Sequence, residues 1–321
     1  MNKKRIISAL QLIISIILIL ILFSRIDVGA FLNLLKGIKP GYFSLGVLCY
    51  LLSMIIITLR WLIILRTANE SVGFVRLLVI NFISSFFSMF LPTAVGGDVA
   101  RMYETSREGM MRTKAVSTVL LDRVIGLMSL VLISVAALLV GHRYMRESSL
   151  VYLITGLTVA FGVAWRLFFT PRVMHHFKWV FHLPLVARGE AGARSLYQSL
   201  YDLYLQPRLL LSTLVISVAA QAIEILSAIF LARALDVQSD AFYFFIFIPL
   251  IWLVTMIPVS LNGLGLRESA FTFFFGQIGV LSTEAVSLSL LVYSCRLLAS
   301  LLGGGLFLRS SMEDSVRKWF K

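Results

Sequence analysis

The chain of 321 residues is poor in charge and in cysteine, and each shortage excludes a class of protein. Only 14% of the residues are charged and 59% are hydrophobic, whereas soluble domains hold about 25% charged and about 45–50% apolar residues. A soluble globular domain is therefore excluded. Cys49 and Cys295 lie in apolar runs without a CxxC spacing, so neither a disulfide framework nor a cysteine metal site is expected.

The motifs of common enzyme classes are also missing. The sequence has no HExxH, no GxSxG and no P-loop. None of its four histidines falls inside a long hydrophobic run, where it could act as a buried general base. We therefore predict a protein that is not an enzyme and has no catalytic residue, no metal and no cofactor.

What the sequence does have is hydrophobic runs, and six of them reach the roughly 20 residues that a bilayer crossing requires. They cover residues 6–23, 42–65, 115–140, 150–169, 209–232 and 285–308. Two shorter runs, 77–91 and 242–257, stop at Pro92 and Pro258. These two either cross the membrane or turn back as re-entrant hairpins.

The distribution of Lys and Arg decides between the two topologies. With a cytoplasmic N-terminus and two re-entrant hairpins, 19 of the 29 basic residues lie inside and seven outside. Eight full crossings would place 12 inside and 14 outside. Because cytoplasmic loops are enriched in Lys and Arg, we predict an all-α integral membrane protein with about six transmembrane helices and two re-entrant helical hairpins. Eight spanning helices are the alternative. Both termini are then cytoplasmic, in a bacterial inner membrane.

The two hairpin segments resemble each other. In residues 90–101 and again in 256–267, a proline is followed by glycine five residues later and by arginine nine residues later. The predicted topology gives these two copies opposite orientations, which is an inverted repeat. The first repeat covers 1–140, the first helix of the second repeat and an amphipathic cytoplasmic linker cover 141–208, and the remainder of the second repeat covers 209–321. The hairpin turns are predicted at Pro92, Gly96, Gly97, Pro258, Gly263 and Gly265.

Charged residues follow each turn, where a new half-helix begins inside the membrane. The free N–H groups at such a helix start carry a partial positive charge, which suits a phosphate or another anion. We predict a substrate-binding set from the two hairpins: Asp98, Arg101, Asn262, Arg267 and Glu268. The alternative is local neutralisation, in which Arg101 pairs with Glu104 and Arg267 pairs with Glu268.

Charges inside the long runs predict a central polar path of Asp122, Arg123, Glu224 and Arg296. Each costs about 2.5–3.5 kcal/mol in a bilayer and is by default functional or paired. We expect Asp122 to pair with an arginine of the other repeat. Arg60, five residues from the end of its run, is interpreted as reaching the membrane interface.

The motifs at residues 91–103, 119–127 and 257–270 resemble the lysylphosphatidylglycerol synthase transmembrane-region family of flippase-like membrane proteins. In bifunctional members, such a domain moves an aminoacylated phospholipid made by a fused cytoplasmic synthase domain. Because this chain ends at Lys321, the resemblance implies a stand-alone member. Other members are linked to polyprenyl-linked sugars, so the resemblance does not identify the lipid. Asn262 departs from a glycine common in the family.

Together these features predict a lipid flippase-like protein that binds or moves a phosphate-containing headgroup, of a phospholipid or a polyprenyl-linked lipid, between leaflets. Its expected partners are membrane lipids with anionic or zwitterionic headgroups, not nucleic acid. One alternative is a non-transporting scaffold for a separate lipid-modifying or glycosyl transferase. An intramembrane lipid-modifying enzyme is the second.

Overall fold

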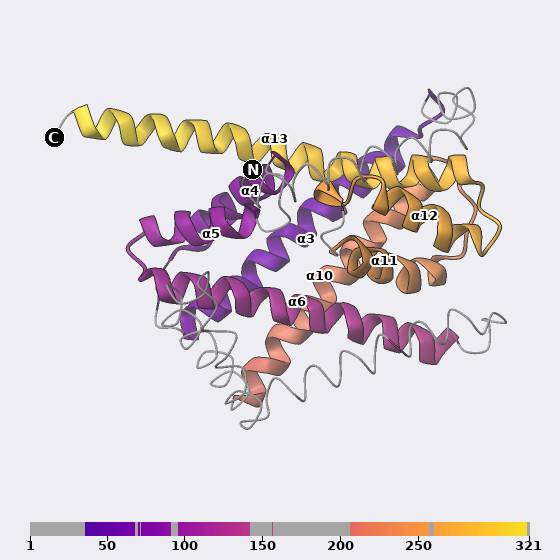
Figure 1. Ribbon diagram of the computed structural model, residues 1–321, viewed down its shortest axis with the longest axis horizontal. Helices are drawn as coiled ribbons and strands as arrows, with labels where there is room; N and C mark the ends of the chain where they lie inside the picture. The colour runs from indigo at the N-terminus through magenta and orange to yellow at the C-terminus, as the bar shows by residue number, and fades with distance from the viewer. Residues whose placement is uncertain are drawn as a thin grey trace, which may run out of the picture.

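The computed structural model describes residues 36–67, 70, 72–90, 96–141, 156, 206–256 and 260–319. Within these ranges the chain forms eight α-helices and no β-strand, which confirms the all-α membrane class (Figure 1). The predicted spans 6–23 and 150–169 fall outside the described residues, apart from Gly156, as do Pro92, Pro258 and nearly all of the predicted linker.

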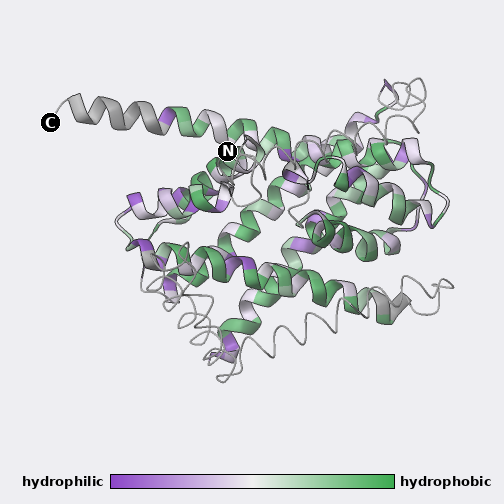
Figure 2. Ribbon diagram, viewed as in Figure 1, coloured by the Kyte–Doolittle hydropathy of each residue, from purple (hydrophilic) through white to green (hydrophobic). Residues whose placement is uncertain are grey.

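Four helices are long and apolar enough to cross a membrane, and each contains one of the predicted spans. They are α3 (Pro40–Thr67), α6 (Arg112–Gly141), α10 (Pro207–Ala234) and α13 (Ser282–Trp319). Green hydrophobic residues predominate along them in Figure 2. These four are the spans that fix the framework of the described part of the chain.

Shorter helices form two hairpins. The first consists of α4 (Phe74–Phe90) and α5 (Gly96–Arg107), and the second consists of α11 (Ala241–Thr255), a 3-10 turn (Leu261–Gly263) and α12 (Leu266–Gly276). At 1.5 Å per residue, the 17 residues of α4 and the 15 of α11 reach about 25 Å and 22 Å, short of a bilayer core of about 30 Å. In each hairpin the second helix packs back against the first.

Backbone geometry explains how the hairpins turn. Asn262, Gly263 and Gly265 have φ angles of 52°, 76° and 78°, a left-handed conformation that glycine adopts without strain. In the first hairpin, a Cβ on Gly97 would lie 2.6 Å from the carbonyl oxygen of Ser84, so only glycine lets α5 approach α4 this closely.

The two halves exchange equivalent contacts. Helices α3 and α10, each of 28 residues, run antiparallel to each other. A 2.7 Å hydrogen bond shows this direction, since Ser227 near the end of α10 donates it to the carbonyl of Gly46 near the start of α3. Helix α4 packs against α13 of the other half, and α11 packs against α6. In Figure 1 the two hairpins lie on opposite sides of the crossing α3–α10 pair, with α13 above and α6 below. This exchange is the geometry of an inverted repeat.

Two glycines permit the contact between α4 and α13. A Cβ on Gly303 would lie 1.9 Å from the carbonyl oxygen of Phe82, and one on Gly304 would lie 2.8 Å from the ring of Phe86. Small residues at helix crossings let backbones approach closely, which is a main source of attraction between helices in lipid. The first hairpin is therefore held by α13, the last helix of the other half.

We expect Gly303→Ala to destabilise the protein by about 1–3 kcal/mol, because its methyl group would overlap the α4 backbone. Gly305→Ala is the matched control, since nothing lies within 4 Å of a Cβ there. The measurement is the midpoint of thermal unfolding in detergent, monitored by size-exclusion chromatography. Equal midpoints for the two variants would contradict the close packing of α4 on α13.

Candidate functional site

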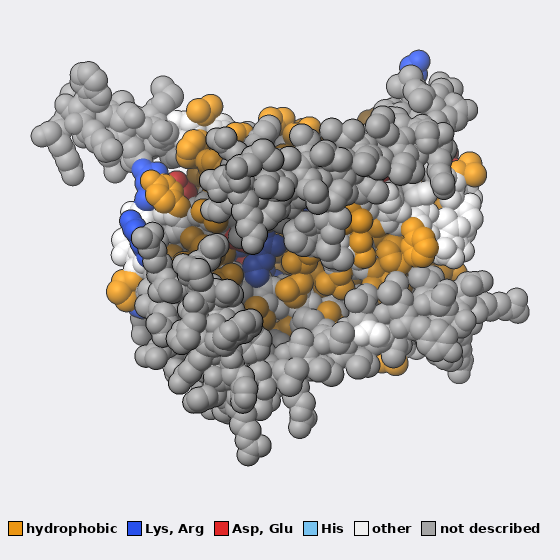
Figure 3. Space-filling model, viewed as in Figure 1, with side chains coloured by type: hydrophobic (Ala, Val, Ile, Leu, Met, Phe, Trp, Pro, Cys, Tyr) orange, Lys and Arg blue, Asp and Glu red, His pale blue; other side chains and the backbone are white. Residues whose placement is uncertain are grey.

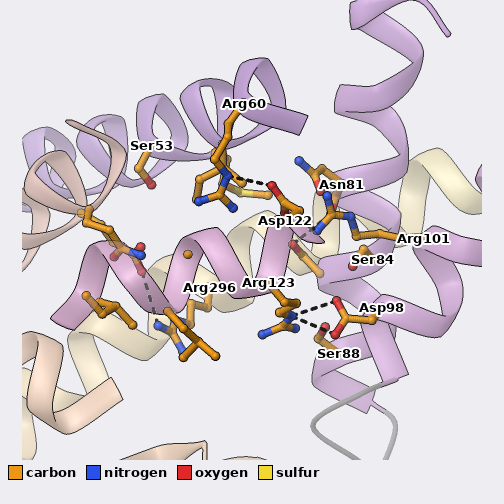
Figure 4. Close-up of a pocket in the computed structure, with 18 of the residues that line it drawn as sticks. Ser53, Arg60, Asn81, Ser84, Ser88, Asp98, Arg101, Asp122, Arg123 and Arg296 are labelled. Carbon is orange, nitrogen blue, oxygen red and sulfur yellow. Dashed lines mark hydrogen bonds and ion pairs between the residues drawn. The ribbon is translucent and has the colours of Figure 1, made fainter. Parts of the chain in front are cut away.

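A cavity of about 300 Å³ lies among α3, α4, α5, α6, α10 and α13 (Figure 4). Charged side chains from both halves line it, among otherwise serine-rich and apolar walls. They are four arginines and three carboxylates: Arg60, Arg101, Arg123, Arg296, Asp98, Asp122 and Glu224. The structure thus brings the whole predicted central path into one cavity with two of the predicted binding residues, Asp98 and Arg101.

Asp122 is the centre of the charged wall and is only 2% exposed. Its Oδ1 accepts a 2.7 Å hydrogen bond from Arg60 Nε, and its Oδ2 lies 3.0 Å from Arg101 Nη1. Arg60 also donates from Nη1 to Ser217 Oγ at 2.5 Å. The expectation that Asp122 pairs with an arginine of the other repeat is wrong, because both partners belong to the first half.

Arg60 is likewise not an interfacial residue. It is 5% exposed and points inward, joining α3 to α6 and α10. Its nearness to the end of a hydrophobic run suggested an interface position, but the buried carboxylate of Asp122 offers a stronger partner than distant water. A charge inside a membrane protein pairs where it can.

Arg101 has an unused binding edge. One guanidinium nitrogen, Nη1, contacts Asp122, and the guanidinium carbon lies 4.0 Å from the ring centre of Trp61. Its Nε and Nη2 atoms are buried and have no hydrogen-bond partner among the described residues. These two N–H groups form the edge with which arginine binds a carboxylate or phosphate in a bidentate fashion. Arg101, which lines the cavity, therefore holds an unsatisfied pair of buried donors.

Two further ion pairs complete the charged lining. Arg123 Nε lies 2.8 Å from Asp98 Oδ2, and Arg296 Nη2 lies 3.4 Å from Glu224 Oε1. The side chains of Arg123 and Arg296 are 42% and 37% exposed, so they are the accessible cations of the site. In the space-filling view, blue Lys or Arg atoms lie in a hollow bordered by orange hydrophobic side chains (Figure 3).

Helix α4 adds a polar stripe that our sequence interpretation missed. Asn81, Ser84, Ser85 and Ser88 line the cavity, at the i, i+3, i+4 and i+7 spacing of one helix face. That spacing within an apolar run was a readable signal. In the second hairpin the residues 166 positions later are Phe247, Leu250, Ile251 and Val254, so its matching face is apolar.

The predicted residues of the second hairpin do not line this cavity. Arg267 and Glu268 form a buried ion pair with each other, and Ser289 hydroxyl lies within hydrogen-bond distance of both. Glu268 Oε2 also accepts the N–H of Gly265 at 2.7 Å, and Arg267 stacks on Tyr293. This local pairing is the alternative that the sequence left open for Arg267.

Asn262 lies at the contact between the two hairpins. Its side-chain amide donates to the carbonyl of Met89, near the end of α4, at 3.4 Å. The first hairpin contributes charged residues to the cavity. The turn of the second hairpin reaches toward the end of α4, which is the first helix of the first hairpin.

The chain matches the family described as the lysylphosphatidylglycerol synthase TM region over residues 8–304. It belongs to this family. A UPF0104 membrane protein of Methanothermobacter thermautotrophicus is 33% identical over 75 residues, which are 23% of this chain and 21% of the relative. One from Methanocaldococcus jannaschii is 28% identical over 120 residues, 37% of this chain and 36% of the relative. The matched stretches thus span about a fifth and a third of these relatives' lengths.

We expect Asp122→Asn to lower stability by about 3–5 kcal/mol, because two buried arginines would lose their counter-charge. Asp236→Asn removes the same charge from the exposed ion pair with Lys39 and is expected to change stability little. Thermal unfolding of both variants in one detergent checks the difference. Similar unfolding midpoints would show that the Asp122 pairs contribute no more than a surface contact.

Proposed function

We propose that this membrane protein binds the phosphate of a lipid headgroup in the cavity and moves that headgroup between the two leaflets. The observation that carries the proposal is the unpartnered Nε and Nη2 edge of Arg101, buried in the cavity wall. An unsatisfied buried donor costs about 1–3 kcal/mol, which an anion with two acceptor oxygens would recover. A phosphate is such an anion, and the hydroxyl groups of Ser84 and Ser88 line the same cavity.

The remaining lining supports a lipid as the source of this phosphate. Apolar side chains share the cavity with the charged ones: Met54, Ile57, Leu127, Leu130 and Met256. The volume of about 300 Å³ is at the lower end for ligand pockets, which hold about 300–1,000 Å³. A headgroup fits such a space with the first methylenes of its acyl chains, while the rest of each chain stays in the surrounding bilayer. Membership in a family named for a lipid synthase points in the same direction.

In the proposed mechanism the headgroup meets Asp98, Arg101 and Arg123 on the side of the first hairpin. The pair of Glu224 and Arg296 continues the polar path across the cavity. Outward movement of one negative charge is favoured by about 2.3 kcal/mol per 100 mV when the cell interior is negative. An anionic lipid then needs no further energy source.

We expect Arg101→Lys to slow lipid exchange between leaflets by about 10–100-fold, because lysine keeps the charge beside Asp122 but lacks the two-pronged edge. The measurement is quenching of dye-labelled phosphatidylglycerol in proteoliposomes. Arg107→Lys on the same helix, outside the cavity, is the control. Exchange that is equally fast in both variants would refute the role of Arg101. No exchange by the unchanged protein would favour the scaffold alternative.

We further propose that the protein lies in a bacterial inner membrane with both termini cytoplasmic and the connection between α5 and α6 inside. This orientation follows from the distribution of Lys and Arg. The two hairpins then enter from opposite sides.

Two equivalent connections test this orientation. Met111 precedes α6 and Leu281 precedes α13, and their side chains are 61% and 64% exposed. With Cys49 and Cys295 replaced by alanine, we expect Met111→Cys to react with membrane-impermeant maleimide only from the cytoplasmic side, and Leu281→Cys only from the outside. The alternative with eight spanning helices puts both cysteines on the outside, so labelling of both from one side would overturn the inverted topology.

A further inference from the structure

The charges that line the cavity do not cancel. Four arginines and three carboxylates face it among the residues that the structure describes, which leaves one positive charge in excess. Each carboxylate accepts a hydrogen bond from an arginine. Arginine itself stays protonated under all ordinary conditions.

The neighbouring charges do not alter this balance. Arg267 and Glu268 neutralise each other outside the cavity. At the far end of α5, Glu104 and Glu108 are matched by Arg76 and Arg107. The excess positive charge therefore belongs to the cavity, next to the unpartnered edge of Arg101.

From this balance we infer that the site selects lipids whose phosphate is a diester with a single negative charge, over phosphomonoester lipids with two. The inference rests on the proposed lipid binding and narrows its substrate class. A diester phosphate neutralises the excess charge. A monoester carries about −1.5 to −2 at pH 7, so it would bring an additional, uncompensated negative charge into a buried site.

The preference arises because burial of the second charge of a monoester costs several kcal/mol, more than one distant positive charge recovers. Coulomb's law gives the shift in this preference for each unit of cavity charge. One unit of cavity charge about 10 Å from a unit charge on the ligand, in a medium of effective dielectric constant about 20, changes the affinity for that ligand roughly tenfold. We therefore expect the purified protein to bind dihexanoyl phosphatidylglycerol about tenfold more tightly than dihexanoyl phosphatidic acid. Isothermal titration calorimetry in detergent at pH 7.5 measures both dissociation constants.

The Glu224 and Arg296 pair provides the decisive variants, because either charge can be removed without touching Asp122 or Arg101. Glu224→Gln raises the net charge of the cavity to +2 and should shift the affinity ratio about tenfold toward phosphatidic acid. Arg296→Gln lowers the net charge to zero and should shift the ratio about as far toward phosphatidylglycerol. The double variant has the original net charge and should restore the original ratio.

The outcomes separate this inference from the proposed function. Equal binding of the two lipids, or a ratio that Glu224→Gln leaves unchanged, overturns the charge rule while lipid binding stands. A double variant that fails to restore the ratio also overturns it, since a local contact would then set the preference. If neither lipid binds, both the inference and the proposed function fail. A preference without leaflet exchange supports the inference and refutes only transport.

A soluble headgroup distinguishes a lipid from a free phosphodiester. Glycerophosphoglycerol carries the same single charge but has no acyl chains to lie against Met54, Ile57 and Leu130. We expect it to bind at least about tenfold more weakly than dihexanoyl phosphatidylglycerol, because burial of each methylene contributes about 0.8 kcal/mol. Equal affinity would overturn the assignment to lipids.

Discussion

The carboxylate of Asp122, shared by two arginines inside the membrane, is the interaction on which the rest of the site depends. Arg60 comes from α3, Arg101 from α5 and Asp122 from α6, and Arg60 continues to Ser217 on α10. One buried anion thus ties the first hairpin to three long helices. Asp122 accepts a hydrogen bond from Nη1 of Arg101 only, and the guanidinium lies over the ring of Trp61. The edge formed by Nε and Nη2 of Arg101 is therefore left without a partner among the described residues. The same contact with Asp122 joins these helices and orients the guanidinium edge that we propose binds phosphate.

The two halves share a backbone arrangement but not a charge pattern. Arg101 and Arg267 occupy equivalent positions 166 residues apart. Arg267 is neutralised by its neighbour Glu268, whose second oxygen accepts the N–H of Gly265, so this pair stabilises the turn of its own hairpin. Arg101 has no such neighbour and reaches a carboxylate on another helix. An inverted repeat can therefore provide symmetric packing around a single charged site, and the chemistry is concentrated in the first hairpin.

Sequence predicted the elements well and the side-chain partners poorly, for physical reasons. Hydropathy and length identify a span locally, and a proline followed by glycine marks a hairpin, so four spans and both hairpins lie where predicted. The partner of a buried charge depends instead on how helices rotate about their axes. Asp122 is 62 residues from Arg60 and 21 from Arg101, and no local pattern joins them. The stripe from Asn81 to Ser88 was within reach, because helical spacing alone reveals it.

The net charge of the cavity bears on which ligand it would bind, but it does not by itself provide transport. A net positive charge next to apolar walls is costly unless water or an anion accompanies it, so the cavity favours an anionic ligand whether or not the protein moves it. Movement needs a second arrangement in which the same charges face the other leaflet. The hairpin that carries Arg101 rests on α13 through Gly303, with no space for a side chain between them. Such a contact resists sliding of α4 along α13, so any second arrangement would keep the first hairpin and α13 together.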